Sequence, residues 1–169
     1  LSASPFDYTH ADDRKFICKN NVLKYRLPLV YCNAVGSQTE IVFDGGSLVF
    51  DKHGDLCKEL PLFEEALSVV EISDDGNINC HPNEKVTDLP EEDSDPEQLQ
   101  PFMNIGQVYQ ALITGIRDYF LKMGFSKAIV GSSGGIDSAV TLVLACDALG
   151  SENVRAVLMP SPYSTAHSV

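Results

Sequence analysis

Apolar and polar positions divide the chain into a β-rich first part and a helical second part. Between residues 29 and 60, short apolar runs are separated by turns that contain glycine. This pattern predicts an antiparallel meander with strands over 29–35, 40–43, 47–51 and 56–60. Apolar positions among charged ones predict a helix over 11–25, and residues 66–72 could add one more strand.

Helical periodicity starts after a charged middle segment. Apolar residues at three- and four-residue spacing predict a helix over 105–123. A short strand over 127–130, a helix over 138–149 and a strand over 154–159 should follow. A strand, a helix and a strand of these lengths predict a parallel βαβ unit.

The middle segment, residues 74–101, is rich in proline and acidic residues, which predicts a solvated linker rather than an acidic binding tail. We therefore expect a first domain over 1–73 and a second over 102–169. A lone βαβ unit with one further helix cannot cover both faces of a parallel sheet. The chain shows no signal sequence, and it starts at Leu1 rather than at an initiator methionine, so we expect a piece of a longer protein.

Composition excludes several function classes. The net charge of −12 argues against binding to nucleic acid or anionic membranes. No apolar run approaches the roughly 20 residues that a membrane helix needs. The 5 cysteines lack CxxC spacing, which favours reduced thiols in a cytoplasm over disulfides or a zinc site.

The strongest chemical signal is the loop Ser133-Gly-Gly-Ile-Asp-Ser138, between the predicted strand and the helix. Backbone N–H groups and the positive end of a helix would surround an anion there, most plausibly a nucleotide polyphosphate. The spacing fits neither a Walker loop, since no lysine follows Gly135, nor a GxGxxG fingerprint. Asp137 would repel phosphate unless Mg²⁺ lies between them. The alternative is that Asp137 is only a helix N-cap.

The loop resembles the SGGxDS motif of the N-type ATP pyrophosphatases, or PP-loop enzymes. The frame 131–138, followed by 158–164, looks like NAD synthetase in particular. Residues 1–6, 30–36 and 40–47 resemble the nitrilase-like glutaminase domain of glutamine-dependent NAD synthetases.

The resemblance implies an α/β chain: part of a nitrilase-like αββα sandwich, then part of a PP-loop, Rossmann-like parallel-sheet domain. It implies ATP-dependent amidation of deamido-NAD through an adenylated intermediate, with ammonia from glutamine. The implied ATP-binding residues are Gly131, Ser132, Ser133, Gly134, Gly135, Ile136, Asp137 and Ser138. Asp137 would hold Mg²⁺, and Ser4 and His10 would contact glutamine.

In the family, a Glu-Lys-Cys triad hydrolyses glutamine, and it should lie upstream of Leu1. We therefore expect no catalytic residue in this segment and no activity from the segment alone. Cys32 is expected to be a buried structural thiol rather than a nucleophile.

Other functions remain open at this point. Another adenylating PP-loop ligase, such as a GMP-synthetase-like or tRNA-modifying enzyme, would share the loop. A nucleotide-binding module without catalysis would also share it. The exposed edges of incomplete domains predict a homo-oligomer or association with missing segments.

Overall fold

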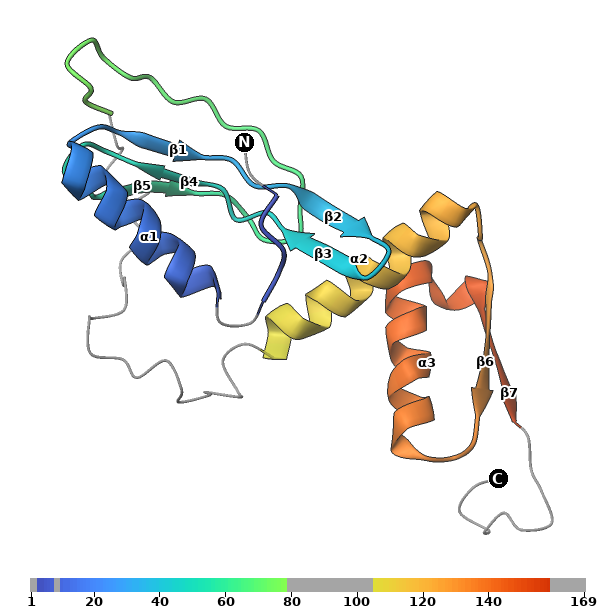
Figure 1. The fold of residues 1–169 in the computed structure, drawn as a ribbon. Coiled ribbons are helices and arrows are strands. Elements are labelled where there is room, and N and C mark those ends of the chain that lie inside the picture. The colour runs from blue at the N-terminus through green and yellow to red at the C-terminus, as the bar shows by residue number, and fades with distance from the viewer. Residues whose placement is uncertain (1–2, 8–9, 79–104, 159–169) are drawn as a thin grey trace. The chain divides into compact units, whose positions relative to one another are not determined.

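The computed structural model describes residues 3–7, 10–78 and 105–158, and side chains within the first helix from residue 13 onward. The chain divides into two compact units (Figure 1). The first contains Leu1–Gly36 and Ile41–Ala111, and the second contains Ser37–Glu40 and Leu112–Val169. Both units contain helices and strands, which confirms the α/β class.

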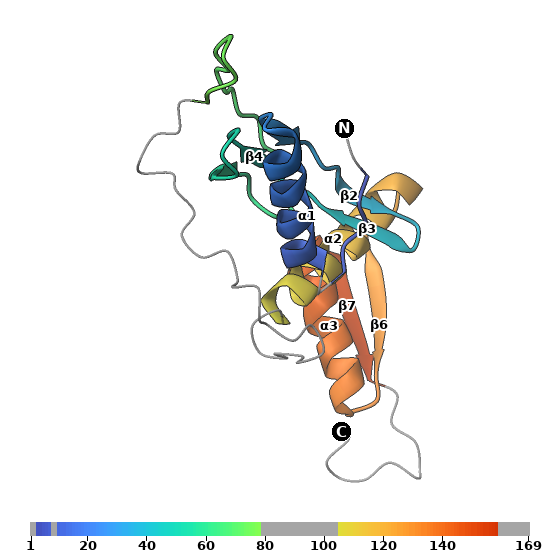
Figure 2. The ribbon, with the colours of Figure 1, turned by 60° about the vertical axis from the view of Figure 1, so that its left-hand side comes forward.

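Helix α1 (His10–Tyr25) covers one face of a small sheet in the first unit, as both ribbon views show (Figures 1 and 2). It confirms the helix predicted over 11–25. Cys18 and Val22 of α1 are buried with sheet residues in one apolar cluster. The sheet side of that cluster consists of Leu48, Phe50 and Leu56. Burial of this face is the main source of stability for α1, because a short isolated helix is only marginally stable in water.

The sheet contains β1 (Leu29–Tyr31), β4 (Leu48–Phe50) and β5 (Leu56–Glu59), all antiparallel, in the order β1-β4-β5. Strands β2 (Val35–Gln38) and β3 (Ile41–Asp44) form a separate pair. The strands predicted over 40–43, 47–51 and 56–60 are confirmed as β3, β4 and β5 within a residue or so. The single strand predicted over 29–35 is wrong, because that run holds β1 and only the first residue of β2, and the order of a simple meander is wrong as well.

The reason for that order lies after β3. Gly45 and Gly46 have φ of 70° and 60°, which residues with a Cβ rarely adopt. Two successive left-handed residues redirect the chain after the β2–β3 hairpin. The next strand, β4, can then pair with β1 instead of extending the hairpin.

Residues 66–71 form no strand, contrary to the expectation for 66–72, because they lack a ladder partner. Only Ile72 makes a bridge, to Ile78, around a turn. In that turn Ser73 Oγ donates to Asp75 Oδ1 at 2.5 Å. This hydrogen bond is the largest of the causes that lower the pKa of Asp75. The rest of the predicted linker, from residue 79 onward, lies outside the described residues.

Helix α2 (Ile105–Met123) confirms the helix predicted over 105–123. It ends in a Schellman motif: Phe125 N–H donates to Phe120 O at 2.8 Å, and Gly124 N–H to Leu121 O at 3.2 Å. The Phe120 and Phe125 rings meet edge to face. Gly124 has φ of 72°, which explains why glycine ends this helix.

In the second unit, the backbone of Ser37 is bound to α2. Ser37 N–H donates to Asp118 Oδ2 at 2.7 Å, and Lys122 Nζ donates to Ser37 O. These contacts place the Ser37–Glu40 turn with this unit.

The second unit contains the predicted βαβ arrangement. Strands β6 (Ala128–Ser132) and β7 (Val154–Leu158) pair in parallel, from Ala128 with Val154 to Ser132 with Leu158. Helix α3 (Ile136–Leu149) connects them through a short 3₁₀ turn (Ser151–Asn153) and lies along both strands (Figures 1 and 2). The predictions for 127–130, 138–149 and 154–159 are thus confirmed within a few residues. No helix in the described ranges is both long and apolar enough to cross a membrane.

The cysteines differ in state. Cys18, Cys32 and Cys146 are free thiols, as expected from their spacing. Cys57 is disulfide-bonded, so the expectation of reduced thiols is wrong at this position. Scattered spacing gives no information about which side chains the fold brings together.

Candidate functional site

The glycine-rich loop joins the end of β6 to the start of α3. Strand β6 ends at Ser132, and α3 begins at Ile136. Gly134 has φ of 81°, so a residue with a Cβ would be strained there. Gly135 has ordinary angles, φ −86° and ψ 160°, and occupies the N-cap position. The whole predicted set, residues 131–138, therefore lies at one strand-to-helix corner.

The N-terminus of α3 has no side chain that caps it. Asp137 lies in the first turn, beyond the N-cap, so the alternative that Asp137 is an N-cap is wrong. The first N–H groups of a helix need partners from outside the helix. An anion would satisfy them and would interact favourably with the helix dipole.

Serine hydroxyls hold the loop closed. Ser138 Oγ donates to Gly135 O at 2.8 Å and accepts from Ser133 N–H at 3.3 Å. The Ser133 and Ser138 hydroxyl oxygens are 3.3 Å apart. Gly135 N–H also reaches Ser133 Oγ at 3.4 Å. The loop thus holds its shape through its own polar groups and faces solvent.

The Asp137 side chain is exposed. Within the described part of the chain, its carboxylate forms no ion pair or hydrogen bond. Its backbone oxygen accepts a hydrogen bond from Thr141 Oγ1 at 2.8 Å. The described residues contain no group of three or more His, Cys, Asp or Glu side chains that could bind a metal alone. One free carboxylate beside an uncapped helix N-terminus is a donor set that could hold Mg²⁺, which proteins typically bind through one or two carboxylates, water and substrate phosphates.

A second polar site lies in the first unit, around Ser4. Ser4 lines a cavity of about 460 Å³, together with Arg14, Tyr31 and Cys32. His10 is the first residue of α1, and its side chain lies outside the described part. The structure therefore places Ser4 at a cavity and leaves the predicted role of His10 untested.

Behind Ser4 lies a buried cluster of polar side chains. Arg14 Nη2 donates to both carboxylate oxygens of Asp44, at 3.1 Å each, and Arg14 Nη1 donates to Gly45 O at 3.2 Å. Asn33 Nδ2 donates to Asp44 Oδ1 at 3.0 Å. The exposed fractions are 9% for Arg14, 7% for Asn33 and 2% for Asp44. Such burial is tolerated only because the charges are paired and bonded.

Sequence reasoning missed this cluster. Asn33 and Asp44 each follow an apolar strand run, where a polar residue at a buried position needs a partner. That signal marks them as special but cannot identify the partner, because Arg14 and Asp44 are 30 residues apart. We call Arg14, Asn33 and Asp44 the polar cluster below.

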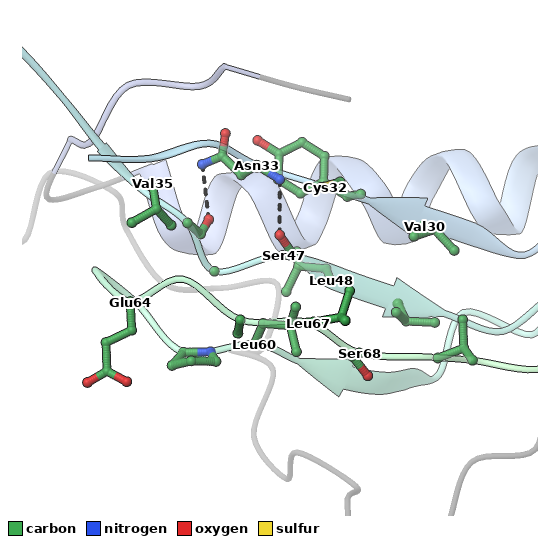
Figure 3. A pocket seen from close by; sticks show the side chains of 17 residues that line it. Val30, Cys32, Asn33, Val35, Ser47, Leu48, Leu60, Glu64, Leu67 and Ser68 are labelled. Atoms are coloured by element: carbon green, nitrogen blue, oxygen red, sulfur yellow. Dashed lines mark hydrogen bonds between the residues drawn. The ribbon is translucent and has the colours of Figure 1, made fainter. Parts of the chain in front are cut away.

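Cys32 is exposed, so the expectation of a buried thiol is wrong. Alternation along β1 explains this: Leu29 and Tyr31 face the core, whereas Val30, 53% exposed, and Cys32 face away from it. Cys32 and Glu64 line a cavity of about 190 Å³, but the Glu64 side chain points away from Cys32 (Figure 3). Among the residues that the structure describes, the geometry gives no general base to make Cys32 a nucleophile.

Fold and loop together define an α/β protein with a glycine-rich loop between the end of a parallel strand and the start of a helix. Residues 108–169 match the protein-family profile described as NAD synthase. The chain is 38% identical over 169 residues to the glutamine-dependent NAD(+) synthetase of Synechocystis sp., an alignment that covers 100% of this chain and 28% of that protein. For the enzyme of the same name from Thermotoga maritima, the identity is 37% over 187 residues, with 100% and 32% covered.

A solved structure agrees with these matches. The glutamine-dependent NAD+ synthetase from Acinetobacter baumannii, in complex with adenosine diphosphate, has a TM-score of 0.82 and 34% identity to this chain. That match covers 99% of this chain and 29% of the solved one. The chain belongs to the glutamine-dependent NAD(+) synthetase family. It spans about 30% of the length of these relatives.

Proposed function

We propose that the full-length protein containing this segment amidates deamido-NAD to NAD, with ATP as the activating substrate and glutamine as the source of ammonia. The observation that supports this most strongly is the loop 131–138, which presents an uncapped helix N-terminus and a free carboxylate at the end of a parallel strand. We propose that this corner belongs to a PP-loop domain over 102–169.

In this proposal the loop binds the phosphates of ATP. The first-turn N–H groups of α3 would donate to phosphate oxygens, and the hydroxyls of Ser133 and Ser138 offer further donors. Gly135 would let the phosphates approach the backbone closely. Packing within the protein does not require glycine at this position, because a Cβ there would meet only Ser133 Oγ, at 3.5 Å. Attack of the deamido-NAD carboxylate on the α-phosphorus would release pyrophosphate and give an adenylate, from which ammonia displaces AMP.

Asp137 would hold Mg²⁺ beside these phosphates. When bound, the ion supplies positive charge that stabilises the leaving pyrophosphate. The role of Asp137 is to orient that charge, since it is the carboxylate of the loop that is free for a ligand. Without the metal, the same carboxylate would repel the nucleotide.

The first unit would belong to a nitrilase-like glutaminase domain over 1–73, joined by a linker over 74–101. Ser4 would contact the amino-acid part of glutamine from the wall of its cavity. His10 would assist near the start of α1. Deamido-NAD and a second copy of the chain are the further partners that the proposal includes.

The test is NAD formation by the full-length protein from deamido-NAD, Mg–ATP and glutamine labelled with ¹⁵N in its amide. The label should appear in the NAD carboxamide, with one AMP and one pyrophosphate for each NAD formed. Asp137→Asn should lose NAD formation with glutamine and with ammonium alike, because both routes need the adenylate. Adenylation of a different acceptor, with no NAD formed, would instead support another PP-loop ligase.

A further inference from the structure

We propose that Asn33 positions Ser4, so that glutamine binding depends on a residue that does not itself touch the substrate. This inference rests on the proposed function, in which Ser4 contacts glutamine. It assigns a role to a buried side chain that the nucleotide chemistry does not use.

Asn33 binds both backbone groups of Ser4 with one amide. Ser4 N–H donates to Asn33 Oδ1 at 2.9 Å, and Asn33 Nδ2 donates to Ser4 O at 3.3 Å. Next along the chain, Pro5 bridges to Phe43 and Phe6 N–H donates to Val42 O at 2.7 Å. Pro5 and Phe6 are thus held by β3, and the Asn33 amide holds Ser4, the residue before them, which lines the cavity.

The direction of the Asn33 amide is set by the rest of the polar cluster. Its Nδ2 also donates to Asp44 Oδ1 and to Gly45 O, each at 3.0 Å. Both partners are acceptors only, so the NH₂ group must face them and Oδ1 must face Ser4 N–H. Arg14 in turn fixes the Asp44 carboxylate. Asn33 N–H adds a bond to Ser47 Oγ at 3.0 Å, which Figure 3 shows.

Asparagine is the side chain that meets all these demands. Its NH₂ group has two hydrogens for three acceptors, so one hydrogen is shared, and the longest of the three bonds is the one to Ser4 O; its Oδ1 accepts from Ser4 N–H. Aspartate would place a second carboxylate against Asp44 without a hydrogen to share, and the like charges would repel. An aliphatic residue would leave Asp44 and Ser4 without this partner.

A double-mutant cycle in the full-length enzyme tests the inference. The variants are Asn33→Ala, Ser4→Ala and both together, with Lys15→Ala as a matched control. Lys15 follows Arg14 on α1 and, among the described residues, forms an ion pair with Glu59 rather than with the polar cluster. The readouts are kcat/KM for glutamine and the rate of NAD formation with saturating ammonium.

We expect each single variant to lower kcat/KM for glutamine roughly tenfold, the value of one hydrogen bond to a charged ligand, mainly through KM. Ammonium-driven NAD formation should stay at the wild-type rate, because that route does not use the glutamine site. Hydrogen exchange of the α1 amides at the wild-type level shows that the first unit still folds. The double variant should be no worse than Ser4→Ala alone, within about twofold, because Asn33 acts through Ser4. Lys15→Ala should match the wild type.

Independent losses that multiply to about a hundredfold in the double variant would overturn the inference. A normal kcat/KM in Asn33→Ala, with a loss in Ser4→Ala, would overturn it too. If Asn33→Ala does not fold, the cycle is run with Asn33→Ser. Absence of glutamine-dependent NAD formation in the wild type would overturn the proposed function itself, which distinguishes the two failures.

Discussion

The buried pair between Arg14 and Asp44 gives the sharpest prediction about stability. Their side chains are 8% and 2% exposed, and the guanidinium reaches both carboxylate oxygens at 3.1 Å. Arg14→Met removes the positive charge and leaves the Asp44 carboxylate buried. Loss of one partner of a buried pair costs about 3–5 kcal/mol, because the remaining charge is not solvated.

The companion substitutions separate charge from packing. Asp44→Leu should cost a similar amount, since it leaves the Arg14 guanidinium buried without its carboxylate. Arg14→Met with Asp44→Leu should cost clearly less than the sum of the single variants, because neither charge remains. Lys15→Met breaks the neighbouring pair with Glu59, which is 2.9 Å long but has side chains 17% and 24% exposed. We expect it to cost less than about 1 kcal/mol.

Native-state hydrogen exchange of the α1 amides in the full-length protein measures these costs. A segment readout is needed because a protein of several domains does not unfold in one step. Two results would refute the reasoning. One is equal loss of protection in Lys15→Met and Arg14→Met, and the other is additive losses in the double variant.

Four further predictions concern the glycines and the cysteines. Gly134→Ala should destabilise α3 by about 1–2 kcal/mol, measured by hydrogen exchange, because Gly134 has φ of 81°. Gly135→Ala should leave stability unchanged but weaken Mg–ATP binding, measured by calorimetry. Equal effects at both positions would contradict this. Gly124→Ala should destabilise the end of α2 by a similar amount, because φ is 72° there, and unchanged protection of α2 amides would count against it. Burial raises the pKa of the Cys18 thiol, an effect that Arg14 partly offsets, so alkylation followed by peptide mass mapping should label Cys32 well before Cys18. Because the pKa of Cys18 is raised in the folded chain, its contribution to stability is complete below the pKa of an unfolded thiol, near ~8.5, and is lost as the pH rises above that value. The Cys18→Ala variant should therefore lose less stability at alkaline pH than the wild type does.

Local patterns were sufficient for the elements of the second unit. Helix α2 and the βαβ arrangement follow from periodicity and from glycines at the ends, and these signals lie within one element or its neighbours. The strand order of the first unit was not predictable in the same way. Pairing of β1 with β4 depends on the two left-handed glycines after β3, whose effect on chain direction no strand pattern encodes.

The candidate site was predictable where it is contiguous in sequence. Residues 131–138 lie together because they form one loop. The polar cluster was not predictable, since Ser4 and Asn33 meet across 29 residues. Cys32 shows a different limit: its apolar neighbours suggested burial, whereas alternation with Val30 places both on the exposed face of β1.

The central claim is that loop 131–138 binds Mg–ATP through the Asp137 carboxylate. Calorimetric titration of the full-length protein with ATP, with and without Mg²⁺, tests it most directly. Glu152→Gln, at the far end of α3, is the matched control, since it also removes an exposed carboxylate. Asp137→Asn should weaken Mg–ATP binding about tenfold or more, while Glu152→Gln binds as the wild type does. Unchanged Mg–ATP affinity in Asp137→Asn would contradict the account.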